Sequence, residues 1–176
     1  MDASGALIEA LVDGLGGDAV VAGDAVGDDY AHDEALGAVP QRPVAVVRPS
    51  TTSDVATTVA IARAHHAPLT ARGSGTGLSG ACTPREGGVV VSFERMREIV
   101  EIDLDNHVAV VQPGVTLEQL DEATKAHGLV YPVFPGESSA SLGGNVATNA
   151  GGMRAVKYGV TRRHVLGLEA VLASAR

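Results

Sequence analysis

The sequence predicts an α+β fold made of two α/β lobes. Short apolar runs of strand length alternate with runs at helical spacing from residue 43 onward. Glycine is abundant, at 22 of 176 residues, and it is clustered, so it marks particular loops. The apolar fraction of 45% and the charged fraction of 19% are typical of a globular chain and not of a disordered one. This length suffices for one domain or for two small lobes that share a core.

The composition excludes several classes of function. A net charge of −8 argues against a protein that coats nucleic acid or an anionic membrane. One cysteine excludes an internal disulfide and a cysteine-rich metal site, and we expect no metal. The N-terminus is acidic where a signal peptide is basic, and no window reaches the roughly 18 apolar residues of a membrane span. We expect a cytoplasmic protein, for which only a partner or a missing part of the sequence could provide peripheral contact with the inner membrane.

The elements follow in chain order. Residues 4–15 have helical spacing of apolar residues, and the acidic residues 22–40 form a lead-in. A strand at 44–47, a helix that begins among Ser50–Ser53 and ends near His65, and a strand at 68–72 form a βαβ unit. The last strand runs into a glycine loop, at the end of a strand where α/β sheets usually bind ligands.

Beyond residue 88 the segments that predict a helix or a strand are shorter. Thr116 and Gln119 form a capping box for a helix that continues to about His127. The second lobe is expected to be a sheet formed from the strands after residue 89. Those strands are predicted at 89–93, on both sides of the turn Asp105-Asn106, and at 165–172.

The first candidate site is ARGSGTGLSG, residues 71–80. Glycines allow consecutive N–H groups to point into one concavity, and such a nest binds phosphate oxygens. The stretch is not a Walker loop, since no Gly-Lys-Ser/Thr follows, and it is a poor Rossmann fingerprint, since no helix clearly follows. A plain connecting loop is the alternative interpretation.

The second candidate site is PGESSASLGGNVATNAGG, residues 135–152. It predicts a short helix at 145–149 whose N-terminus, preceded by serines, would suit an anion. Asn145 and Asn149 would share one face of this helix, which favours contact with a polar ligand edge. The alternative is a flexible surface loop.

Two loops suited to binding phosphate in one chain suggest a dinucleotide ligand. The segments RGSGTGLSG, PGESSASLGGNVATNAGG and KYGVTRRHVLGLEAVL resemble the FAD-binding domain of the vanillyl-alcohol-oxidase/PCMH-type flavoproteins. The branch that they resemble most comprises the glycolate oxidase FAD subunit and D-lactate dehydrogenase. The lead-in DDYAHD and the segment RPVAVVRPSTTSDV are also similar to that branch, so the resemblance covers nearly the whole chain.

The resemblance implies that FAD is the cofactor and lies between the two lobes. Main-chain N–H groups of the first loop would hold its pyrophosphate; these residues are Gly73, Ser74, Gly75, Thr76 and Gly77. The flavin, the ribityl chain, the wall behind them and the adenine end would involve Pro135, Gly136, Ser141, Gly143, Gly144, Asn145, Thr148, Asn149, Gly152, Tyr158, Gly159 and Val165. Relatives with covalent flavin carry histidine in the place of Thr76, so non-covalent FAD is expected. Arg163 departs from the acid that relatives often carry there.

The resemblance also implies an organisation and an activity. Residues 1–38 would be an N-terminal helix and lead-in, and residues 39–176 the FAD-binding domain. Family members are more than twice as long and have a second domain that binds the substrate. They oxidise a 2-hydroxy acid of the glycolate or D-lactate type by hydride transfer to flavin N5. We therefore expect a fragment or a truncated product that would need its missing domain to act on such a substrate.

Several alternatives remain open. The chain could be an inert flavin-binding fragment, a subunit of a split oxidoreductase completed by a partner or by self-association, or an NADPH-dependent reductase of the same superfamily. Packing or solvent exposure is the favoured interpretation of the other chemistry-bearing side chains, with no catalytic residue assigned. These side chains are His32, His65, His66, Cys82, His107, His127, Glu137 and His164, and phosphate neutralisation stays open for Arg154 and Lys157.

Overall fold

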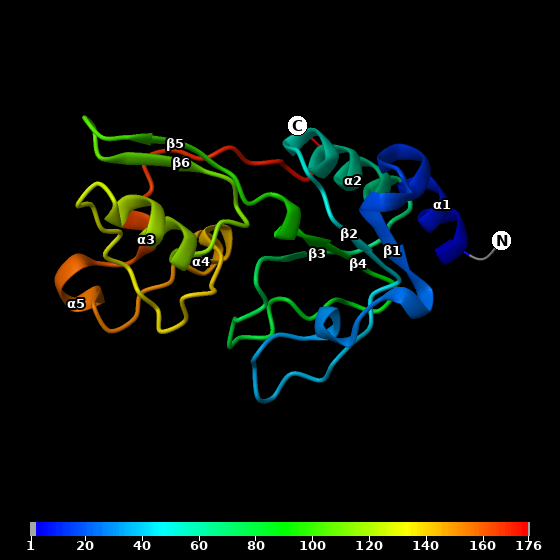
Figure 1. Ribbon diagram of the computed structural model, residues 1–176. Helices are drawn as coiled ribbons and strands as arrows, with labels where there is room; N and C mark the ends of the chain where they lie inside the picture. Colours follow the sequence, from blue (N-terminus) through cyan, green and yellow to red (C-terminus); the bar gives the residue numbers. More distant parts are fainter. Residues whose placement is uncertain (1–2, 176) are drawn as a thin grey trace. The chain divides into compact units, whose positions relative to one another are not determined.

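The computed structural model describes residues 3–175 and divides them into two compact units (Figure 1). The first unit contains residues 3–95 together with 170–175, and the second contains residues 96–169. Helices and strands occur in both, so the prediction of an α+β fold with two lobes is confirmed. No helix within residues 3–175 has the length and apolarity needed to cross a membrane.

The first unit is built on a four-stranded sheet. Its strands are β1 (Val20–Ala22), β2 (Ala45–Val47), β3 (Leu69–Arg72) and β4 (Val89–Ser92), in the order β1-β2-β4-β3. β4 pairs in parallel with both β2 and β3, whereas β1 is antiparallel to β2. The predicted second-lobe sheet from residue 89 onward is therefore wrong in one respect. The strand after residue 88 belongs to the first unit, where it separates the two strands of the βαβ unit.

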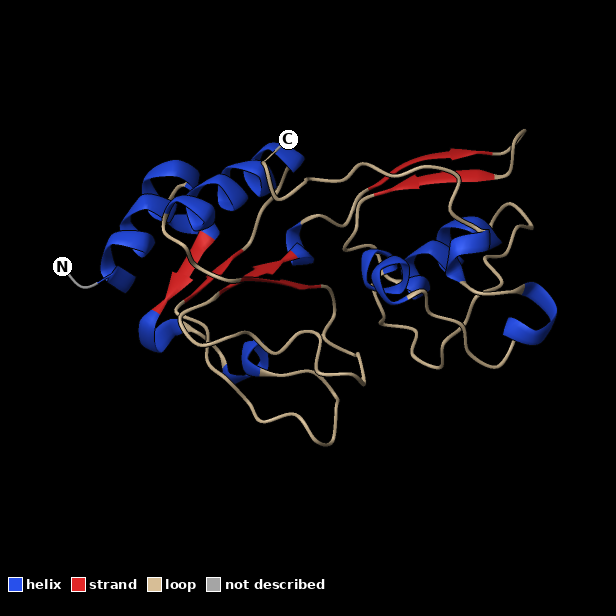
Figure 2. Ribbon diagram, turned by 180° about the vertical axis from the view of Figure 1, so that it is seen from behind, coloured by secondary structure: helices blue, strands red, loops and turns tan. Residues whose placement is uncertain are grey.

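Both faces of this sheet are covered, as its continuous valine runs require. On one face lie α1 (Ala3–Leu15) and α2 (Thr52–Ala64), which pack side by side in Figures 1 and 2. Leu7 and Leu11 of α1 share a core with Val47. The N-terminal helix and the helix after residue 50 are confirmed, and Thr51 is the N-cap of α2 with a complete capping box.

The acidic lead-in covers the opposite face. Side chains alternate along a strand, so Val46 and Val90 point away from the helices. They pack with Val26 and Tyr30, which come from the lead-in and its short 3₁₀ turns at Gly23–Ala25 and Asp28–Ala31. The lead-in is consequently a packed layer of the first unit.

The second unit is built around a hairpin and three helices. β5 (Ile99–Asp103) and β6 (Val108–Val111) are antiparallel, and the Asp103 carboxylate accepts the N–H groups of Asp105 and Asn106 in the turn. This confirms the two strands predicted around that turn. α3 (Leu117–Lys125) has the predicted capping box of Thr116 and Gln119. Two shorter helices follow, α4 (Leu142–Thr148) and α5 (Ala155–Tyr158), and the latter was not predicted.

The predicted strand at 165–172 is wrong. The segment has strand composition but forms no ladder with any described residue, and Leu166, Leu168 and Leu172 are exposed. A strand exists only where a neighbouring edge pairs with its N–H and C=O groups. Within the described residues this segment pairs with no strand edge.

Candidate functional site

The first glycine loop follows β3, and most of its backbone N–H groups form no hydrogen bond within the described residues. No backbone N–H from Ser74 to Ser79 donates to an acceptor within residues 3–175. Gly75 and Gly80 have φ of 76° and 75°, in the left-handed region that favours glycine. Unpaired consecutive N–H groups on such a backbone are the donors that an anion-binding nest provides.

A buried arginine lies directly behind this loop. Arg72 ends β3 with 8% of its surface exposed, and its Nη1 donates to the His32 carbonyl at 2.7 Å. Its guanidinium stacks on the Tyr30 ring at 5.6 Å from the centroid. It also lies so close to Gly75 that an added Cβ would collide with it. A fixed positive charge therefore supports the centre of the loop.

Cys82 closes the loop as a packed thiol. Burial raises its pKa, the nearby Arg72 charge opposes this, and Asp33 raises the pKa further. The Gly73 N–H donates to the sulfur. A thiol with a raised pKa is protonated at neutral pH, so it is a poor nucleophile.

In the second unit, the glycine-rich segment folds as a capped helix. The Ser141 hydroxyl accepts the Gly144 N–H at 3.3 Å, so α4 begins at Leu142 and not at the predicted Asn145. The Gly143 N–H donates to the Pro113 carbonyl at 2.8 Å, and an added Cβ at Gly143 would meet the Pro113 backbone at 2.9 Å. Ser141 and Gly143 thus both have partners within the protein.

Asn145 is the exception in this segment. Its side chain lies on α4 with 4% of the residue exposed, and its amide Nδ2 has no hydrogen-bond partner within residues 3–175. Buried side-chain donors are nearly always paired, and an unpaired one costs about 1–3 kcal/mol. This amide is therefore suited to donate to a ligand.

Asn149 and Thr148 have roles inside the protein. Asn149 is the C-cap of α4 with φ of 51°, and its Oδ1 accepts the Arg162 N–H at 3.1 Å. It does not continue the helical face of Asn145, so the prediction that the two share a face is wrong. The Thr148 hydroxyl donates to the Gly144 carbonyl at 2.9 Å.

The remaining residues of the predicted flavin region separate into packed and open positions. Gly152 has φ of 94°, and an added Cβ would collide with the Phe134 carbonyl, so this glycine is required by the protein's own packing. Gly136 has φ of 110° and open space around it, which leaves its backbone approachable. Of the other four residues, Pro135 and Val165 are half-buried, Tyr158 is exposed, and Gly159 lies against the Arg163 side chain.

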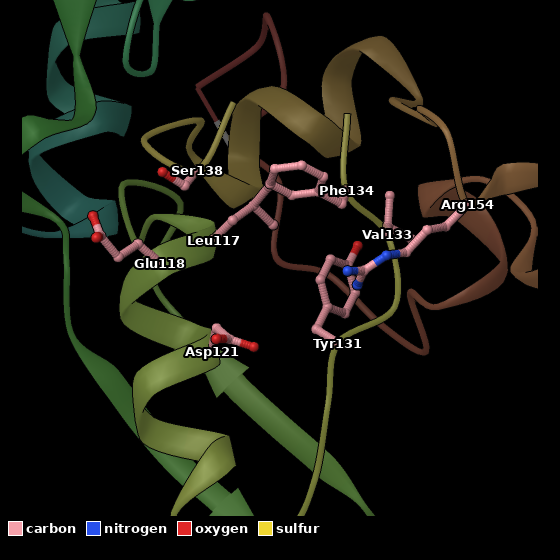
Figure 3. A pocket seen from close by; sticks show the side chains of 8 residues that line it. All are labelled: Leu117, Glu118, Asp121, Tyr131, Val133, Phe134, Ser138 and Arg154. Atoms are coloured by element: carbon pink, nitrogen blue, oxygen red, sulfur yellow. The ribbon is translucent and has the colours of Figure 1, made fainter. Parts of the chain in front are cut away.

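The second unit also contains an open hollow of about 290 Å³ (Figure 3). Figure 3 shows the carboxylates of Glu118 and Asp121, both from α3, on one side, and the Arg154 side chain on the other beside Tyr131. The Arg154 guanidinium stacks on Phe134 at 5.7 Å from the ring centroid. The hollow therefore combines charges of both signs.

Glu137 and His164 are engaged locally. The Glu137 pKa is lowered, first by the Ser139 N–H and then by the Ser139 hydroxyl, so it is an exposed anion held in its own turn. His164 Nε2 lies 3.1 Å from the Tyr158 carbonyl, and its ring meets Tyr131 edge-on. The interpretation of both side chains as structural agrees with these contacts.

One residue that contacts the glycine loop was not among the predicted site residues. Asp33 belongs to the lead-in and is only 6% exposed, with its carboxylate beneath the glycine loop. In the sequence it is one of several acids in DDYAHDE, and nothing in that run distinguishes a buried carboxylate from a solvated one.

Comparison with known proteins assigns the family. A family model described as "FAD binding domain" matches residues 43–176. An FAD-linked oxidoreductase of Mycobacterium tuberculosis, described as uncharacterised, is 58% identical over 87% of this chain and 33% of its own length. A D-lactate dehydrogenase of Archaeoglobus fulgidus is 48% identical over 85% of this chain and 34% of its own length. A glycolate oxidase subunit of Bacillus subtilis is 44% identical over 82% of this chain and 31% of its own length.

Solved structures confirm the fold. The grass pollen allergen Phl p 4, with glucose dehydrogenase activity, has a TM-score of 0.82 at 23% identity over 97% of this chain and 37% of its own. The 6-hydroxy-D-nicotine oxidase of Arthrobacter nicotinovorans has a TM-score of 0.76 at 25% identity, over 89% of this chain and 34% of its own. The chain spans about a third of the length of these relatives. It has the PCMH-type fold, and it belongs to the FAD-binding domain family of the FAD-linked oxidoreductases.

Proposed function

We propose that this chain binds FAD non-covalently, with the loop at residues 73–77 contacting the pyrophosphate. The observation that carries the proposal is the run of N–H groups from Ser74 to Ser79 that find no acceptor in the described part of the chain. Such a run satisfies several phosphate oxygens at once, and the buried Arg72 charge favours an anion there. Thr76 offers no nitrogen or sulfur for a covalent bond to the flavin.

The second unit fits the other parts of FAD. The unpaired Asn145 amide would donate to a hydroxyl or carbonyl oxygen of the ribityl or flavin region, and the open Gly136 would allow a flat ring to approach the main chain. The other predicted contacts, from Pro135 to Val165, remain proposals. Several of them support the segment through bonds inside the protein, as Ser141 and Asn149 do.

We further propose that the longer protein to which such a domain belongs oxidises a 2-hydroxy acid to a 2-oxo acid. Relatives named D-lactate dehydrogenase, glycolate oxidase subunit and D-2-hydroxyglutarate dehydrogenase share that substrate class by name. Bound FAD supplies the hydride acceptor for this chemistry. The described residues bind and orient the cofactor, while no residue in this chain is assigned to substrate. An inert flavin-binding fragment, or a subunit completed by a partner, remains the alternative for the chain alone.

The exposed apolar side chains of the second unit support a covering partner. Met153 is 82% exposed, Leu166 80% and Leu168 67%. Large exposed apolar side chains of this kind are the ones that contribute to interaction surfaces. We propose that another part of a longer protein, a partner subunit or a second copy covers them.

The test is a titration of the 176-residue chain with FAD, followed by flavin fluorescence. We expect saturable binding, release of all flavin on acid precipitation, and no turnover of D-lactate or glycolate with a dye acceptor. Gly75→Ala should weaken binding at least about tenfold, because its methyl group would displace Arg72 and strain the loop.

Gly87→Ala is the matched control. Gly87 has a similar φ of 71° but open space around it, and it lies in the turn before β4. It should carry the same backbone strain without weakening FAD binding. A wild-type chain that fails to bind added FAD would refute the proposed function.

A further inference from the structure

We infer that Asp33 is a positioning residue that holds the glycine loop in the conformation competent to bind a pyrophosphate. The inference deepens the proposed function and rests on it. Asp33 touches no part of the proposed ligand position and acts only through the loop backbone.

The Asp33 carboxylate accepts backbone N–H groups from the lead-in and from the loop. Oδ1 accepts from Ala35 at 3.1 Å and from Gly80 at 3.2 Å, and Oδ2 accepts from Cys82 at 3.4 Å. A Cβ added at Gly77 would lie 3.4 Å from Oδ2, so the carboxylate lies beneath this part of the loop too. One buried carboxylate thereby fixes the backbone of the loop at Gly80 and Cys82.

A second set of contacts anchors the lead-in to the loop independently of the carboxylate. The Glu34 N–H donates to the Gly77 carbonyl at 2.9 Å, and the Arg72 guanidinium donates to the His32 carbonyl. Tyr30 donates to Glu94 at 2.7 Å, which joins the lead-in to the short 3₁₀ turn Phe93–Arg95 that follows β4. The lead-in is therefore bonded to Arg72 and to Gly77 as well as to the residues that contact Asp33.

This arrangement separates the backbone N–H groups of the loop into those bonded to Asp33 and those left for a ligand. Those of Gly80 and Cys82 point inward to Asp33, and those from Ser74 to Ser79 have no acceptor among the described residues. A carboxylate satisfies the inward donors more strongly than a neutral acceptor would. With the inward groups fixed, the remaining ones are preorganised for an anion, and preorganisation lowers the cost of ordering on binding.

The inference predicts a split between binding and folding. Asp33→Asn keeps the size of the side chain, but its amide NH₂ faces a backbone N–H donor. We expect FAD affinity to fall about tenfold, since hydrogen bonds to a charged acceptor are lost from the loop. The thermal midpoint of the FAD-free chain should change far less than it does in Asp33→Ala. Asp24→Asn is the matched control, because Asp24 is an exposed acid of the same lead-in.

Cys82 provides a readout that does not depend on FAD. It is the only cysteine in the sequence, it is half-buried, and its backbone N–H is one of the groups bonded to Asp33. We expect Asp33→Asn to increase the rate of Cys82 modification by a disulfide reagent several-fold, and to shift the amide proton resonances of Gly80 and Cys82. Asp24→Asn should leave both measurements at wild-type values.

The outcomes separate the two proposals. If the wild-type chain binds no FAD while Asp33→Asn exposes Cys82, the proposed function fails and the positioning of the loop by Asp33 stands. If Asp33→Asn binds FAD as tightly as wild type, or leaves the Cys82 rate and the two resonances unchanged, the inference about Asp33 is overturned.

Discussion

Asn145 should oppose folding in the free chain and favour cofactor binding, so its replacement separates the two effects. In Asn145→Ala the unpaired buried donor disappears, which removes a cost of about 1–3 kcal/mol. Alanine also has the higher helix propensity in α4, by about 0.6 kcal/mol. Against this, the lost packing of a small buried side chain costs about 1–2 kcal/mol.

The sum favours the variant by about 1 kcal/mol in the FAD-free state. For a chain of this length, 1 kcal/mol corresponds to a rise of about 2–4 °C in thermal midpoint. Binding should change in the opposite direction. Losing one donor to the ligand should weaken FAD binding roughly two- to tenfold. The assays are thermal unfolding without flavin and flavin fluorescence with it.

Asn149→Ala is the matched control, four residues later. Asn149 holds the left-handed C-cap and accepts the Arg162 N–H, so its replacement should lower stability by about 1–2 kcal/mol. The two substitutions are chemically identical and should shift the thermal midpoint in opposite directions. A midpoint that falls in Asn145→Ala as it does in Asn149→Ala would show that the Asn145 amide is satisfied in the folded chain, and the reasoning would be refuted.

Three further predictions concern packing and titration. Gly152→Ala should destabilise the chain by about 3 kcal/mol or more, because it combines a φ of 94° with a collision at the Phe134 carbonyl; an unchanged denaturation midpoint would contradict this. Burial, followed by the hydrogen bond to Glu94, raises the pKa of Tyr30 to about 12. The neutral phenol is thus favoured in the folded state, so its contribution to stability should be complete below pH ~10 and decline toward pH ~12, and Tyr30→Phe should flatten this part of the pH–stability profile. Sedimentation should detect concentration-dependent association of the chain alone, and Met153→Glu should reduce it; a strictly monomeric wild type would argue against a second copy as the cover.

The two glycine segments, the α1 and α2 helices and the cap at Thr116 follow from the sequence alone, and the cap of α2 was narrowed to residues 50–53. Each depends on residues within one or two helical turns of one another, so the physical signal is local. The boundary of α4 was misplaced for an equally local reason. Ser141, and not a glycine, supplies the cap, and the helix begins one residue after it.

Other features depend on contacts between distant segments. β4 separates β2 from β3 because parallel pairing joins strands that are far apart in sequence, and no local pattern records which strands become neighbours. The segment 165–172 has the composition of a strand but pairs with no strand edge among the described residues, so composition alone gave the wrong prediction.

The sequence by itself determined that glycines concentrate at two loops and that those loops suit a dinucleotide. Only the tertiary structure decided which groups in them are unpaired. Gly152 is required by contact with Phe134, Asn149 caps its own helix, and Asn145 keeps a free amide. Asp33 lies under a loop more than forty residues away in sequence. The physical reason is that burial and hydrogen-bond satisfaction depend on the whole fold, whereas residue type and spacing depend only on the chain.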